Sequence, residues 1–354
     1  VRSNGALGTS PLVMGGGPAY FSSAAPTLAS LGGQAGTIFL GDAAASADTV
    51  LTVGNASVTV FFGSIGDVSD SANGSLVKTG TGTLTLSGTN TYTGTTTVAE
   101  GQLALGQRSA LYNGNTAAWT ASNIVVQPGA TLDFRVGGGG EFVDSDIAAL
   151  ATGGFAAGSA IGFDTTSGDF EFTGALTGQA GLYKTGNNVL KLSGGNIYTG
   201  VTTIIQGTLE AGNTGGISMP GDVVMGKARL DVFVNMAAND QFSAGSVLTF
   251  ANGSGAPNSK LQLRGTNQTV AGLESTRNDR LSIVHNDETS APGYIGNPGP
   301  ATLTLNATSD HSFHGIIRDR DGAALSIVKN GTGTQEFINA AVQGYGYTGG
   351  TTIN

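Results

Sequence analysis

The sequence contains no cysteine and few charged residues. None of its 354 residues is cysteine, so the chain can form neither disulfides nor thiolate metal sites. Charged residues make up only 11% of the chain, and Trp119 is its single tryptophan. Gly, Thr, Ser, Asn and Val, which all lower helix stability relative to Ala, are frequent instead. These absences exclude a disulfide scaffold and favour β-structure over helices.

Positive charge is also scarce. The chain has 15 Lys and Arg against 24 Asp and Glu, which gives a formal net charge of -9. Nucleic-acid binding is not expected, because it needs clustered basic residues. No apolar run approaches the roughly 20 residues that a membrane-spanning helix requires, so no transmembrane segment is expected either.

A long internal repeat is the main feature that is present. The stretch GSLVKTGTGTLTLSGTNTYTGTTTVAEGQLALG at residues 74–106 recurs as GLYKTGNNVLKLSGGNIYTGVTTIIQGTLEAG from Gly181. A looser copy, LSIVKNGTGTQEFINAAVQGYGYTGGTTIN, runs from Leu325. Each copy follows a Phe-x-Gly-x-(Ile/Leu) element. Residues 1–354 are therefore predicted to form one continuous solenoid of three repeat units, 1–106, 107–212 and 213–354, the last with an insertion and cut short at its end.

Short segments inside each unit alternate between apolar and polar residues, which is typical of half-buried strands. Leu84 and Leu103 lie 19 residues apart, and so do Leu190 and Leu209. A coil of about 20 residues with two or three strands predicts an all-β, right-handed parallel β-helix. Its leucines would stack inside, and its Thr, Ser and Asn would face solvent. At about 4.8 Å per rung, roughly 14 to 18 rungs would make a rod on the order of 70 to 85 Å long.

The shared positions resemble the passenger-associated transport repeat of bacterial autotransporters. That pattern runs F-x-G-x-I and then L-x-K-x-G-x-G-x-L-x-L-x-G-x-N-x-Y-x-G-x-T. The positions that carry the resemblance form a structural signature: Phe61, Gly63, Lys78, Gly80, Leu84, Leu86, Tyr92 and Gly94; Phe172, Gly174, Lys184, Gly186, Leu190, Leu192, Tyr198 and Gly200; Phe313, Gly315, Lys329, Gly331, Tyr347 and Gly349. The second copy departs at Asn188, and the third departs at Gln335 and Phe337.

This resemblance implies a β-helix on the outer surface of a bacterium or in the extracellular space. In the family, such a segment often serves as a stalk that helps the passenger to fold as it emerges. The resemblance carries no catalytic residues and no cofactor to this chain.

The search for chemistry finds no distinct active site. The acidic candidates are Glu141, Asp144, Asp146, Asp164, Asp169 and Glu336. Lone carboxylates at turns are usually turn formers or solvating groups, so no acid and base pair is expected. Asp319 and Asp321 in DRDG are weak calcium candidates, but no full calcium-binding loop follows them.

The histidines are expected at solvent-exposed edges or turns. His311 and His314 are three residues apart, which in a strand directs them to opposite faces and disfavours a shared metal. The same position is expected for His285. No metal ligand set is therefore predicted.

Three functions are compatible with these observations. The first is a non-enzymatic structural and adhesive segment of an autotransporter-like surface protein. The second is a filament or matrix subunit in which copies of the chain join end to end, as an alternative to a segment cut from a longer array. The third is a glycan-binding or glycan-active protein that acts on host or matrix glycans through the insertions at 137–169 and 278–300. An exposed line of aromatic residues would favour this third function, but the sequence does not place Tyr112, Trp119, Tyr183 and Tyr294 on one face.

Overall fold

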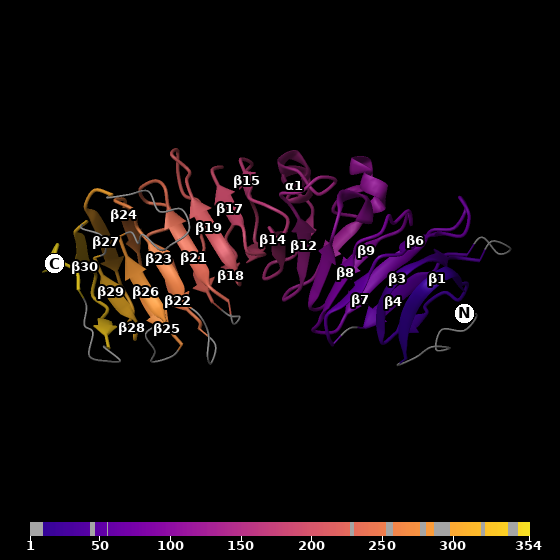
Figure 1. Ribbon diagram of the computed structural model, residues 1–354, viewed down its shortest axis with the longest axis horizontal. Coiled ribbons are helices and arrows are strands. Elements are labelled where there is room, and N and C mark those ends of the chain that lie inside the picture. Colours follow the sequence, from indigo (N-terminus) through magenta and orange to yellow (C-terminus); the bar gives the residue numbers. More distant parts are fainter. Residues whose placement is uncertain are drawn as a thin grey trace. The chain divides into compact units, whose positions relative to one another are not determined.

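The computed structural model describes residues 10–42, 47–54, 56–226, 230–252, 258–276, 281–286, 298–319, 323–338 and 346–354. The chain divides into two compact units, residues 1–164 and 165–354, and each is described by itself. In both units the strands of successive coils pair side by side in parallel (Figure 1). The expected all-β parallel solenoid is confirmed.

The first unit contains two parallel sheets. The first sheet runs in the order β1 (Pro11–Phe21), β3 (Ser30–Leu40), β5 (Thr59–Phe61), β8 (Thr83–Leu86), β10 (Gln102–Leu105), β12 (Thr131–Arg135) and β14 (Ala160–Asp164), and β6 (Ser64–Asp67) also pairs with β3. The second sheet runs in the order β2 (Thr27–Leu28), β4 (Val50–Gly54), β7 (Ser75–Thr79), β9 (Thr96–Val98), β11 (Ile124–Val126) and β13 (Gly154–Phe155).

The second unit repeats this arrangement and extends it. One sheet contains β16 (Gly181–Thr185), β18 (Thr202–Ile204), β20 (Val223–Met225), β22 (Val247–Phe250) and β25 (Gly272–Ser275). Another contains β15 (Phe170–Phe172), β17 (Val189–Leu192), β19 (Gly207–Ala211), β21 (Val232–Met236), β23 (Ser259–Gln262), β26 (Ser282–His285) and β29 (Ile316–Arg318). Two smaller sheets contain β24 (Asn267–Val270), β27 (Ala301–Asn306), β30 (Leu325–Asn330) and β32 (Thr351–Ile353), and β28 (His311–Phe313) with β31 (Gln335–Phe337).

The core consists of columns of apolar side chains that run from rung to rung. In the first unit Leu84 pairs in register with Leu103, which pairs with Leu132. All three side chains are fully buried. In the second unit Leu190 and Leu209 pair in the same way. The spacing of 19 residues in the sequence therefore corresponds to one coil, as predicted.

Some polar side chains also lie in this core, which corrects the expectation that Thr faces solvent. Thr96 pairs in register with Leu76 and Ile124 and is fully buried. Thr202 occupies the equivalent position in the second unit and is also fully buried. The expectation was wrong at these positions because each hydroxyl has a buried hydrogen-bond partner inside the solenoid.

The first unit also bears a lateral cap, which we define as residues 107–123 and 141–150. It contains three 3₁₀ turns, η1 (Arg108–Ala110), η2 (Tyr112–Gly114) and η3 (Thr116–Ala118), and the helix α1 (Asp144–Leu150). These elements lie at one edge of the unit's strands (Figure 1).

Aromatic packing and one arginine hold the lateral cap together. Phe142 packs against Phe134 of β12 and against Trp119, with ring centroids 4.9 and 5.9 Å apart. Arg108 pairs with Asp146 of α1 at 2.8 Å and also lies 5.1 Å from the centre of the Trp119 ring. The 3₁₀ segment and α1 are therefore joined to each other and to the core.

The two segments expected as insertions are partly regular rungs. Residues 137–169 include α1, but they also include β13 and β14, which pair with β11 and β12. The expectation that this stretch interrupts the repeat was therefore wrong for its second half. In 278–300 the described strand β26 pairs with β23 and β29, and Tyr294 lies outside the described residues.

In the part of the chain that is described, no helix has the length and apolar character needed to cross a membrane.

Candidate binding site

The signature lysines point into the solenoid. Lys78 is fully buried, and its Nζ donates to the backbone oxygens of Thr79 and Gly80 at 2.7 Å and of Glu100 at 3.2 Å. Lys184 is also fully buried and makes the equivalent contacts with Thr185, Gly186 and Gln206. Each ammonium thus joins carbonyls of its own rung to a carbonyl of the next.

The glycine two positions after each lysine makes this geometry possible. Gly80, Gly186 and Gly331 all have positive φ, between 75 and 79°. This left-handed conformation suits glycine and directs the turn carbonyls toward the ammonium. Burial lowers the pKa of Lys78 to about 8, an effect that the nearby Glu100 carboxylate partly offsets.

The signature tyrosines bond to the threonine four residues later. The hydroxyls of Tyr92 and Thr96 are 2.7 Å apart, and both side chains are buried. Tyr198 bonds to Thr202 in the same way, and Tyr347 to Thr351 at 2.6 Å. Burial raises the pKa of Tyr92 and Tyr198. In the first two repeats the pair is a structural clamp, since it satisfies two hydroxyls inside the core.

The Phe-x-Gly element has a steric explanation. Phe61, Phe172 and Phe313 are fully buried. A Cβ at Gly63 would lie 2.4 Å from the Phe61 ring and 2.3 Å from the Gly36 oxygen. A Cβ at Gly315 would meet the Phe313 ring at 2.2 Å. The glycine therefore leaves room for the phenylalanine two positions earlier.

Three of the acidic candidates are engaged in ion pairs or in hydrogen bonds with the backbone. Asp146 pairs with Arg108, Asp164 pairs with Arg135, and Asp169 accepts from the Val189 amide. In the described part of the chain no three His, Asp or Glu residues are grouped closely enough to hold a metal ion.

The calcium candidates do not form a site in the described residues. The Asp319 carboxylate accepts the amide hydrogens of Leu325 and Thr348, both at 2.6 Å. It therefore closes a turn. Asp321 lies outside the described residues.

Two of the three histidines are buried, which corrects the expectation of exposed edges. His285 has no exposed surface, and His311 is 7% exposed. Nδ1 of His311 lies 2.9 Å from a Glu274 carboxylate oxygen. The expectation failed because neighbouring rungs cover these histidines, which a pattern within one strand does not reveal. His314 is half-buried and bonds to Ser312.

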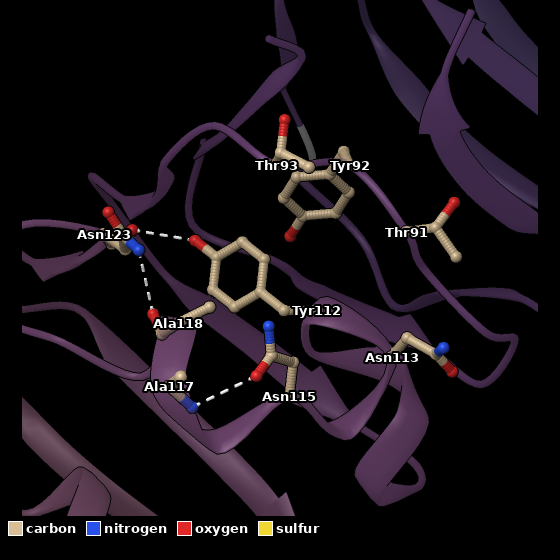
Figure 2. A pocket seen from close by; sticks show the side chains of 9 residues that line it. All are labelled: Thr91, Tyr92, Thr93, Tyr112, Asn113, Asn115, Ala117, Ala118 and Asn123. Carbon is tan, nitrogen blue, oxygen red and sulfur yellow. Dashed lines mark hydrogen bonds between the residues drawn. The ribbon is translucent and has the colours of Figure 1, made fainter. Parts of the chain in front are cut away.

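The lateral cap and the first signature repeat enclose a cleft with a volume of about 550 Å³. Figure 2 shows the Tyr112 ring in the middle of the lining side chains, near Tyr92 and above Asn115. Its lining comes from two segments and consists of Thr91, Tyr92 and Thr93 from the repeat, and Tyr112, Asn113, Asn115, Ala117, Ala118 and Asn123 from the cap.

Hydrogen bonds fix the two tyrosines at the floor of this cleft. Thr96 donates to the Tyr112 hydroxyl at 3.0 Å, and that hydroxyl donates to the Asn123 backbone oxygen at 2.9 Å. The rings of Tyr92 and Tyr112 meet edge to face, with centroids 5.4 Å apart. Burial raises the pKa of Tyr112 to about 12, so both phenols stay neutral at physiological pH.

Sequence reasoning did not find the cleft. An exposed line of aromatic residues would favour glycan binding, but Tyr112 and Trp119 are largely buried, with 5% and 6% exposure. The sequence signal that could have indicated the cleft is a longer connection between strands in the first unit than in the second. Residues 106–123 connect β10 to β11, whereas only residues 212–222 connect the equivalent β19 and β20.

Comparison with known proteins explains the repeat. The family model described as Passenger-associated-transport-repeat matches residues 76–105, 182–211 and 327–354. These ranges contain the three lysine-to-threonine signatures described above. The chain therefore contains three passenger-associated transport repeats, and the predicted resemblance to this repeat is confirmed.

A curated relative supports the same class. The chain is 29% identical over 271 residues, 74% of its length, to a protein described as "Adhesin BmaC autotransporter" from Brucella suis biovar 1 (strain 1330). It spans only 7% of the length of that relative. No solved structure matches. The repeats and this similarity place the chain at the cell surface or in the extracellular space.

Proposed function

We propose that this chain is a non-enzymatic, adhesive segment of an autotransporter passenger. The similarity to an autotransporter adhesin over 74% of the chain carries the proposal. Because the chain covers a small part of that relative, the target of adhesion does not transfer with the similarity. We expect host or matrix surfaces as partners.

The arrangement of the repeats supports a structural framework in preference to a catalyst. In the first two repeats the signature lysines and tyrosines are buried and bonded within the solenoid, so they hold rungs together and leave the lateral surface to other residues. The acidic candidates Asp146, Asp164 and Asp169 hold turns and ion pairs. Adhesion would then depend on surface features such as the lateral cap.

Bead adhesion tests the proposal directly. Beads coated with the purified chain would be incubated with cultured animal cells and with extracellular matrix. Beads coated with the heat-unfolded chain would serve as the control. We expect the folded chain to increase bead retention and the free folded chain to compete with it. Equal retention of both kinds of bead on every surface would contradict an adhesive role.

A further inference from the structure

We propose that the cleft between the lateral cap and the first passenger-associated transport repeat binds a neutral saccharide. This deepens the proposed adhesive function and rests on it for the source of the ligand. The cleft volume of about 550 Å³ lies within the usual range of small-molecule sites.

The polar groups of the lining are suited to hydroxyl groups. Asn113 and Asn115 are exposed in the cleft, and their amides offer both donors and acceptors. The Asn115 side-chain carbonyl accepts from the Ala117 amide, and its amide nitrogen points toward Tyr112 (Figure 2). Thr91 adds an exposed hydroxyl on the opposite segment. Amides and hydroxyls of this kind recognise a polyol by direct hydrogen bonds.

Charge argues for a neutral ligand. None of the nine lining residues is charged. The nearby Asp67 carboxylate is already occupied by the amide and hydroxyl of Thr93, at 3.0 and 2.6 Å, and by the Gly74 amide at 2.8 Å. A phosphate or a sulfated sugar would therefore find no positively charged partner among the lining residues.

Backbone geometry argues against a peptide added as a strand. Such a peptide needs a row of unpaired backbone donors and acceptors. In the cap the amides of Asn113, Gly114 and Asn115 donate to Asn90, Leu111 and Tyr112, respectively. Side chains therefore carry the recognition, and the edges of Tyr112 and the two alanines supply the apolar floor.

Strain in the cap is consistent with a binding role. Tyr112 and Asn113 both have positive φ, 50° and 53°. This conformation is unfavourable for an aromatic residue and persists only where the surroundings enforce it. Here the bond from the Asn113 amide to the Asn90 oxygen, at 2.7 Å, and the Tyr112 hydroxyl bonds enforce it. As a result, the Asn113 side chain is held at the rim of the cleft.

Saturation-transfer-difference NMR on the purified chain tests the inference. The probes would be glucose, galactose, N-acetylglucosamine and N-acetylgalactosamine, with glucuronic acid as the charged comparison. We expect saturable transfer to at least one neutral sugar and none to glucuronic acid. Absence of transfer to all four neutral sugars, or binding of the charged sugar alone, would overturn the inference.

Two substitutions locate the binding. Asn113→Gly removes an amide while keeping the positive φ accessible, and Asn115→Asp keeps the acceptor for Ala117 but removes the donor. We expect the double variant to bind at least tenfold more weakly. Asn187→Gly, at an exposed position in the second repeat, is the matched control and should bind as the parent does. Equal binding by all three proteins would overturn the assignment to this cleft.

The fluorescence of Trp119 verifies that the variants keep the lateral cap, because Trp119 is the chain's single tryptophan and packs inside it. Bead adhesion then separates the two proposals. Adhesion without sugar binding would refute the saccharide cleft and leave the adhesive role standing. Sugar binding without adhesion would refute the adhesive role and leave the saccharide cleft standing.

Discussion

At the scale of single residues, the buried lysines are the least expected feature. A charged group loses its hydrogen bonds to water on burial. Lys78 replaces them with hydrogen bonds to three backbone carbonyls. Those carbonyls belong to the Lys78 rung and to the next rung along the chain. The lysine is therefore part of the rung-to-rung hydrogen bonding.

We expect Lys78→Met to lower the free energy of unfolding by about 1 to 3 kcal/mol, because buried carbonyls lose a charged donor. Urea denaturation followed by circular dichroism measures this change. Lys191→Met is the matched control, since Lys191 is partly exposed and paired only with Glu171. Its effect should stay within about 0.5 kcal/mol. Equal effects of the two substitutions would argue against the bonding role of Lys78.

The lowered pKa of Lys78 predicts a dependence of stability on pH. Above about pH 8 the folded protein has lost the Lys78 proton, whereas the unfolded chain keeps it up to about pH 10.5. The unfolded state then binds more protons, so this group makes the free energy of unfolding rise with pH in that window. Denaturation at pH 7.5, 8.5 and 9.5 should show a smaller rise for Lys78→Met. A difference between the two proteins that does not vary with pH would contradict the lowered pKa.

At the scale of elements, the glycines of the signature are needed where rungs approach closely. The Gly63 position leaves no space for a Cβ between the Phe61 ring and the Gly36 oxygen. At other glycines, such as Gly139, a Cβ would have no atom within 4 Å. Glycine is thus required by close packing at Gly63 but not at Gly139.

We expect Gly63→Ala to destabilise the first unit by more than about 2 kcal/mol, because the contact at 2.3 Å is with backbone that cannot move away. Gly139→Ala should change stability by less than about 0.5 kcal/mol. Thermal unfolding monitored by Trp119 fluorescence compares the two substitutions within one unit. If Gly63→Ala unfolds at the same temperature as Gly139→Ala, the steric explanation of Phe-x-Gly fails.

At the scale of the whole molecule, all three repeats bond a lysine ammonium to turn carbonyls, but the lysine is buried to different degrees. Lys78 and Lys184 are fully buried, whereas Lys329 is half-buried and, among the described residues, bonds to the oxygens of Asn330 and Gly331. The contribution of a hydrogen-bonded charge falls with exposure to solvent.

We therefore expect Lys184→Met to destabilise about as much as Lys78→Met, and Lys329→Met to cost less than about 1 kcal/mol. Urea denaturation of the three variants under identical conditions ranks their losses in the free energy of unfolding. A Lys329 effect as large as that of Lys184 would show that the ammonium contacts do not depend on burial as proposed.

The sequence by itself determined the strands, the length of the coil and the repeat. Leu84 and Leu103 could be paired from their spacing because alternation and period are local properties of a solenoid, in which each coil contacts its neighbours. The resemblance to autotransporter passengers followed from the same positions.

Only the tertiary structure decided which polar side chains lie inside and where a cleft forms. Thr96 and His311 are buried because neighbouring rungs supply their partners, Tyr112 and Glu274, which are distant in sequence. The cleft needs the contact between the cap and the repeat, and that contact depends on the left-handed backbone at Tyr112 and Asn113. Strain of this kind is enforced by long-range packing, so no local pattern reveals it.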